Sequence, residues 1–193
     1  MTSLPLTQPQ RSALVDTSLA LLLQEQPEAQ QLVDVVSAGD PGRRRLALRA
    51  LLAMRPAIPL PAELNVSLER LLAAEAAERE TVDALSLPRT EVDPRLSLWR
   101  GDITTIRADA IVNAANSTLL GCFQPLHACI DNAIHSAAGP WLRQECADIM
   151  AARDRPESTG TATVTSGYHL PATHVIHTVG PIVQGKPTAE HEA

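Results

Sequence analysis

The chain changes character at a proline-bracketed segment, residues 87–94, and this change limits the possible fold more than any other feature. Before the segment, apolar residues recur three and four positions apart, which predicts amphipathic helices. After it, short β-branched runs alternate with helical stretches, which predicts an α/β sandwich. We therefore expect a helical extension over residues 1–86, a linker over residues 87–94 and an α/β unit over residues 95–193.

Local signals place the elements within this outline. In the extension, Pro41 and Pro61 are each expected to open a helix, because proline is tolerated in a first helical turn. Two helices are predicted in the α/β unit, over residues 126–138 and 140–153. The predicted strands are residues 96–99, 110–113, 161–166 and 174–179.

Composition argues against two classes of partner. The net charge is −6 and the chain holds only one Phe, one Tyr and two Trp, so both the basic surface and the stacking platforms of a nucleic-acid binder are missing. The local basic run of Arg43, Arg44 and Arg45 with Arg49 is interpreted as a solvated helix face. No stretch reaches the roughly 18 apolar residues of a membrane helix, and no membrane partner is expected.

The amino terminus lacks the basic start and apolar run of a signal peptide, so we expect a cytoplasmic protein. The cysteines, three in number, should then be reduced thiols rather than disulfides.

Residues 121–135 concentrate the reactive side chains, with two cysteines, two histidines and an acid in fifteen positions. Cys122, His127 and Cys129 are ligand types that Zn²⁺ prefers, and three protein ligands leave one position of a tetrahedral ion open. His127 and Cys129 are two residues apart and would point in different directions on a helix. A loop holding a zinc ion is therefore expected here.

Other residues of these types are interpreted as structural. His135 follows Asp131 by one helical turn and is expected to be packed or hydrogen-bonded, and Cys146 is expected to be a buried small side chain. The histidines of the later strands, His169, His174 and His177, have no acid or cysteine at ligand spacing and are assigned no chemistry.

Several motifs occur in order: Gly-Asp-Ile-Thr at 101–104, Asp-Ala-Ile-Val-Asn-Ala-Ala-Asn-Ser at 109–117, Ile-Asp-Asn-Ala-Ile-His at 130–135, and His-Thr-Val-Gly-Pro at 177–181. Over residues 95–183 this pattern resembles the macrodomain family. The resemblance implies a three-layer α/β/α sandwich that binds ADP-ribose and, in many members, hydrolyses it from proteins. The insertion at 122–129 and the helical extension resemble the zinc-containing bacterial subgroup.

The resemblance also implies roles for individual residues. Asp102 and the backbone NH of Ile103 would bind adenine, Asn116 would orient the distal ribose, and Asp131 would position the attacking water. The zinc ion of Cys122, His127 and Cys129 would lie beside that ribose. The implied ligand-binding set is Asp102, Ile103, Asn113, Asn116 and Gly121, and the implied catalytic set is Asp131 and Asn116.

Plainer interpretations stay open. Asp102 can be a cap residue, Asn113 and Asn116 can cap a turn, and Asp131 can be a helix N-terminal acid stabilised by the dipole. The partner is then ADP-ribose or an ADP-ribosylated protein for a hydrolase, or ADP-ribose alone for a non-catalytic binding module. An inactive truncated remnant is the third alternative.

The macrodomain resemblance also bears on length. Members continue past the His-Thr-Val-Gly-Pro motif with further strands, helices and a second glycine-rich loop. Residues 95–193 are therefore expected to be the N-terminal half of such a domain, with an uncovered apolar sheet face.

Overall fold

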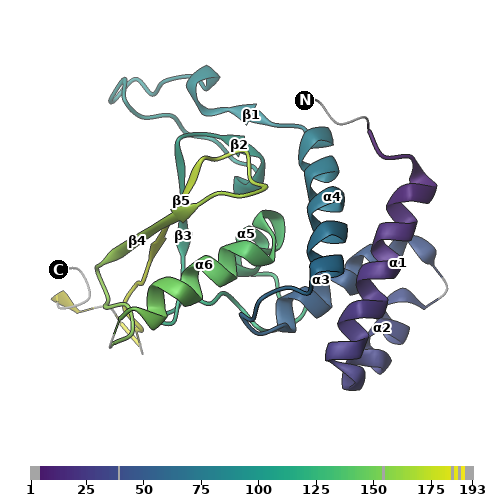
Figure 1. The fold of residues 1–193 in the computed structure, drawn as a ribbon. Coiled ribbons are helices and arrows are strands. Elements are labelled where there is room, and N and C mark those ends of the chain that lie inside the picture. The colour runs from purple at the N-terminus through teal and green to yellow at the C-terminus, as the bar shows by residue number, and fades with distance from the viewer. Residues whose placement is uncertain (1–4, 39, 154, 184, 187, 190–193) are drawn as a thin grey trace.

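The computed structural model describes residues 5–38, 40–153, 155–183, 185–186 and 188–189. Helices make up the first part of the chain and lie together on one side of the molecule (Figure 1). They are α1 (Gln8–Glu25), α2 (Gln30–Ser37), α3 (Arg44–Met54) and α4 (Ala62–Glu78), with the short 3₁₀ turns Pro27–Ala29 and Pro41–Arg43. Pro41 opens a 3₁₀ turn that leads into α3, and α4 begins directly after Pro61, as predicted.

The helical extension has its own core. Leucines at helical spacing turn inward from α1, α3 and α4, and each such buried side chain contributes on the order of 2 kcal/mol. The fully buried leucines here are Leu19, Leu22, Leu48, Leu51, Leu64, Leu68 and Leu71. At the start of α1, Thr7 and Gln10 form a capping box that satisfies the first NH groups of the helix.

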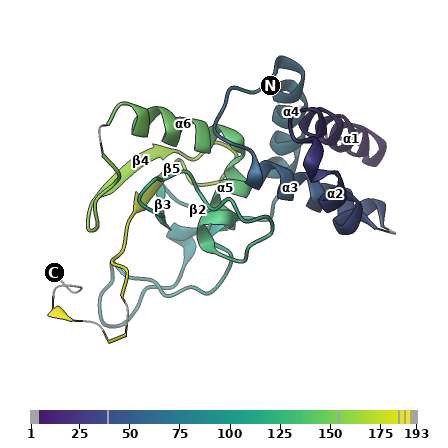
Figure 2. The same ribbon diagram turned by 90° about the horizontal axis from the view of Figure 1, so that it is seen from below.

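The second part is a mixed sheet with helices on one face. Its strands, β3 (Ala110–Ala114), β4 (Ala162–Ser166) and β5 (His174–Thr178), lie in the order β3-β5-β4. β3 and β5 are parallel, and β4 and β5 are antiparallel. Helices α5 (Ile130–Ala138) and α6 (Pro140–Ala151) lie along the sheet in both ribbon views (Figures 1 and 2). A separate parallel pair joins β1 (Val82–Asp83) to β2 (Ile106–Arg107).

Side chains alternate across the sheet. Ile111 and Val175 pack with Ile134 and Leu142 in one buried cluster beneath α5 and α6. On the opposite face, Val112 and Val164 are 53% and 55% exposed. The predicted α/β fold class with a helical extension is confirmed, and the expected exposed apolar residues of the sheet are present.

Two predicted elements differ from the structure. Residues 96–99 are not a strand, because Ser97 makes only an isolated bridge to Arg89 and Leu98 is 90% exposed. The helix predicted from residue 126 begins instead at Ile130, since the side chain of Cys129 accepts a hydrogen bond from the Asn132 NH and caps it.

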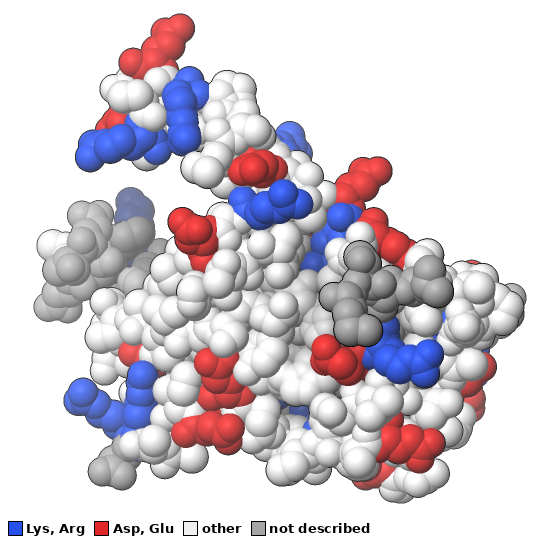
Figure 3. Space-filling model, turned by 45° about the horizontal axis from the view of Figure 1, so that its top comes forward, with Lys and Arg blue, Asp and Glu red and all other residues white. Residues whose placement is uncertain are grey.

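The interpretation of the arginine run as a solvated helix face is wrong in part: Arg43 is exposed, but Arg45 and Arg49 are half-buried. Arg44 pairs with Asp16, but Arg45 pairs with Glu75 of α4 at 2.7 Å and Arg49 points to Asn132 of α5. These partners come from other helices, which sequence spacing does not reveal. Elsewhere, basic and acidic side chains are interspersed on the face shown in Figure 3.

Within the residues that the structure describes, each helix is too short or too polar to cross a lipid bilayer.

Candidate active site

The loop between β3 and α5, residues 115–129, is here called the site loop. Its path needs a left-handed backbone at Leu119, Gly121 and Leu126, with φ of 57°, 78° and 58°. Non-glycine residues in this region cost on the order of 1 kcal/mol or more each and persist only where the surroundings fix them. Asn116 supplies part of that restraint, because its amide nitrogen donates to the Gly121 carbonyl at 3.0 Å and its oxygen accepts from the Thr118 NH at 3.0 Å.

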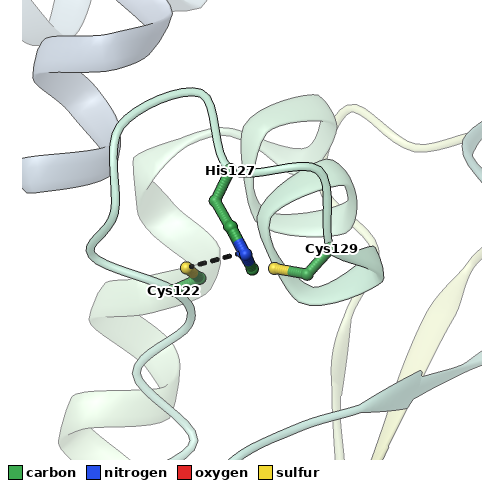
Figure 4. A group of neighbouring side chains, drawn as sticks. All are labelled: Cys122, His127 and Cys129. Atoms are coloured by element: carbon green, nitrogen blue, oxygen red, sulfur yellow. Dashed lines mark hydrogen bonds between the residues drawn. The ribbon is translucent and has the colours of Figure 1, made fainter.

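The site loop brings Cys122, His127 and Cys129 together, as the sequence predicts (Figure 4). Their ligand atoms lie within 4.8 Å of one another, with Cys122 Sγ 3.6 Å from His127 Nδ1. The sulfur and imidazole donors and their partial exposure fit a zinc ion. Burial raises the pKa of the Cys129 thiol, the hydrogen bond from Asn132 opposes this, and Cys122 and Asp131 add to the rise.

Asp131 lies in the first turn of α5, and a hydrogen bond from a residue of the sheet holds its carboxylate. The Asn113 amide nitrogen donates to Asp131 Oδ1 at 2.8 Å and approaches His177 Nδ1 at 3.2 Å, so its two hydrogens fit these two acceptors. Asp131 is 6% exposed and Asn113 is fully buried. Burial raises the pKa of the Asp131 carboxyl, while the hydrogen bond from Asn113 opposes the rise.

The sequence assigned His177 no chemistry, but the structure joins it to this network. With its Nδ1 accepting, the Nε2 proton of His177 is directed at Thr165 Oγ1, 3.0 Å away, and Cys146 Sγ lies 3.8 Å from the same nitrogen. Asn113 and His177 are register partners on β3 and β5. The sequence does show which residues of each strand share a face. It places Asn113 beside His177 only once the register of the two strands is known.

His135 and Cys146 are buried, as predicted. His135 Nε2 lies 3.5 Å from Asp131 Oδ1, and both ring nitrogens are without a hydrogen-bond partner among the described residues. Together with His177, these two side chains form a buried group behind Asp131.

The sequence motifs now have a common location, on one side of the sheet and on the loop that leaves it. Residues 112–193 match the Macro domain family. A protein named Protein-ADP-ribose hydrolase from Treponema medium is 58% identical over 91 residues, which are 47% of this chain and 35% of that protein. A protein of the same name from Staphylococcus aureus (strain MSSA476) is 42% identical over 142 residues, or 74% of this chain and 53% of that one.

The chain thus spans about a third to a half of the length of these two relatives. A solved Trypanosoma brucei macrodomain in complex with ADP-ribose is 33% identical and covers 69% of this chain and 59% of that one. Its TM-score is 0.45, so no structural detail is carried over from it.

Asp102 caps the 3₁₀ turn Ile103–Thr105. Its Oδ1 accepts from the Thr104 NH at 2.9 Å and from the Thr104 hydroxyl at 2.8 Å, as in the plainer interpretation. Asp102 is exposed and Ile103 is half-buried. Adenine contacts by Asp102 and Ile103, and ribose contacts by Asn116 and Gly121, stay predictions. Asn113 is buried and hydrogen-bonded to Asp131, and its ligand contact also stays a prediction.

Arg143 is a further residue of the site that the sequence did not single out. Its Nε donates to the Leu120 carbonyl of the site loop at 2.7 Å, and its Cζ lies 4.4 Å above the Phe123 ring. Its Nη1 donates to carbonyls at the C-terminal end of α3, including those of Ala53 at 3.0 Å and Arg55 at 2.6 Å. Because its hydrogen-bond partners are backbone atoms, no side-chain pattern in the sequence reveals them.

The buried His177 should make stability pH-dependent. Burial lowers its pKa from 6.5 to about 4, so between these values the unfolded chain binds the proton and the folded chain does not. The free energy of unfolding should therefore fall as pH drops from 6.5 to 4, by on the order of 3 kcal/mol from this group. Urea unfolding at a series of pH values measures the slope.

His177→Gln should make that slope shallower, whatever its effect on absolute stability. His174→Gln is the matched control, because His174 is exposed on the same strand and should leave the slope unchanged. An unaltered slope in His177→Gln would contradict the assignment of a buried neutral imidazole.

Proposed function

We propose that this chain acts as a zinc-dependent hydrolase that removes mono-ADP-ribose from proteins. The observation that carries the proposal is the position of Asp131. Asp131 lies at the start of α5, two residues after Cys129 of the cysteine and histidine cluster. Its carboxylate is held by a hydrogen bond from Asn113. A carboxylate beside a polarising cation suits activation of water, and the relatives named Protein-ADP-ribose hydrolase support this reaction class.

In this proposal each residue has a defined role. Asp102 and Ile103 bind the adenine, and Asn116 and Gly121 hold the distal ribose. Asp131 orients a water molecule and accepts a proton as the water oxygen attacks the distal ribose carbon. The bond from that carbon to the protein side chain breaks, and the proton returns to the departing side chain.

Zinc held by Cys122, His127 and Cys129 would supply a Lewis acid that polarises a ribose hydroxyl or a water. Two thiolates offset the charge of the ion, so we assign it to orientation and polarisation ahead of hydroxide generation. The ligands must be reduced, which fits our expectation of a cytoplasmic protein.

The direct test incubates the chain with a protein that carries a single radiolabelled ADP-ribose and measures release of free ADP-ribose. Release above the uncatalysed rate is expected. A non-catalytic binding module would bind ADP-ribose in calorimetry and release none from the protein. Absence of both binding and release would contradict the proposal as a whole.

Purified protein should carry about one zinc ion per chain, because two thiolates and an imidazole form a strong zinc site. Elemental analysis of the protein measures this content. Cys122→Ser and Cys129→Ser should each reduce it to a small fraction, whereas Cys146→Ser should not, because Cys146 lies in α6 and is not one of the three clustered side chains of the site loop. Unchanged zinc in both site-loop variants would contradict the metal assignment.

A further inference from the structure

Two adjoining clefts lie where the helical extension meets α5. One is lined by residues that include Arg49 of α3 and Cys122 of the site loop. The other has a volume of about 180 Å³, and its lining includes Arg49 and Asp102. Arg45, Arg49 and Ser136 line both clefts. Arg49 therefore lies between the residue expected to bind adenine and the residues expected to lie beside the distal ribose.

The arginine side chains that line these clefts differ in how many hydrogen-bond and ion-pair partners they have. Arg45 is neutralised by Glu75 through two hydrogen bonds of 2.7 and 2.8 Å. Arg79 donates to the carbonyls of Thr104 and His169. Among the described residues, Arg49 makes one long hydrogen bond, from Nη2 to Asn132 Oδ1 at 3.3 Å, and no ion pair.

The Nε of Arg49 is buried and has no acceptor within the described part of the chain. A buried donor of a charged group that lacks an acceptor is costly, and such a group needs an explanation in a native structure. A guanidinium that keeps an unused N–H edge is suited to a phosphate, which accepts two parallel hydrogen bonds. The geometry therefore favours an anionic ligand group at Arg49.

We propose that Arg49 binds the diphosphate of ADP-ribose, so that the helical extension contributes to the ligand site. This inference rests on the proposed function, because it needs adenine at Asp102 and the distal ribose beside Cys122. The diphosphate joins these two ends of the ligand and would pass Arg49, which is one of the three residues that line both clefts. The extension is then part of the binding site as well as a packing partner of α5.

The test compares ADP-ribose, ADP and adenosine by calorimetry on the full chain. Arg49→Ala should weaken ADP-ribose and ADP binding about tenfold or more, because a charged hydrogen-bond donor is lost, and should leave adenosine binding unchanged. Arg49→Lys should lose less, since it keeps the charge without the planar fork. Arg44→Ala is the matched control, because Arg44 lies on the same helix but pairs with Asp16. The Arg44→Ala variant should bind all three ligands as the parent does.

Each other outcome counts against the inference. Equal affinity of the parent and Arg49→Ala for ADP-ribose would overturn the role of Arg49 and leave the proposed function standing. An equal loss for adenosine would show that the substitution deforms the cleft rather than removing a phosphate contact. A parent chain that binds none of the three ligands would overturn both proposals. Arg49→Gln, which retains the aliphatic stem, replaces Arg49→Ala if that variant does not fold.

Discussion

Asp131→Ala should reduce the turnover of ADP-ribosylated protein by on the order of a hundredfold or more, while ADP-ribose binding changes little. A positioned acid or base contributes roughly 10²- to 10⁴-fold to catalysis, and this contribution is made in the transition state. The structure gives the loss a specific cause, because the Asn113 amide fixes the Asp131 carboxylate at 2.8 Å. Single-turnover release of ADP-ribose measures the chemical step, and calorimetry measures binding.

Asp131→Asn is the informative companion variant, since it keeps the size of the side chain and removes the base. It should be nearly as inactive as Asp131→Ala. If Asp131→Asn kept most of the activity, the carboxylate would act only as a helix N-terminal residue, which is the plainer interpretation of the sequence.

Arg143→Ala should destabilise the folded protein by about 3 to 5 kcal/mol. Arg143 is 6% exposed, and its guanidinium donates to Leu120 of the site loop and to carbonyls at the end of α3. Its removal leaves these carbonyls buried without a donor and also removes the contact with Phe123. Urea unfolding measures the change.

Arg143→Lys is the matched control for Arg143→Ala. One ammonium cannot reach the carbonyls on both sides, so an intermediate loss is expected. Phe123→Leu removes the ring contact alone and should cost much less. Equal stability of Arg143→Ala and the parent would contradict the bridging role.

The sequence predicted those features that depend on local pattern. β3, β4 and β5 lie within a residue or two of the predicted strands, because β-branched runs bounded by turns favour strands and each of these runs has a neighbouring strand to pair with. The site loop was predicted because His127 and Cys129 cannot converge from one helix. The cluster in the structure agrees with that argument, although its ion remains a proposal.

The remaining features depend on contacts between distant residues. The 96–99 segment has a strand-like composition, but a strand needs a neighbour to accept its hydrogen bonds. His177 is a polar residue on a buried strand face, and it joins Asn113 only through the register of two strands far apart in sequence. Arg49 was interpreted as solvated because the helix it faces, α5, begins about eighty residues later.

The pairing of β3 with β5 also bears on the order of folding. Ala110 is a register partner of His174, so this parallel pair forms only after the intervening chain of about sixty residues has closed into a loop. The contacts of α3 with α1 and α4, such as Arg44 with Asp16 and Arg45 with Glu75, span 28 and 30 residues. These contacts should form first, because folding is faster where contact order is low. Asn113 and His177 meet only when the late pair forms. The group that holds Asp131 should thus be completed last, and a chain that has folded only its helical extension would have no site.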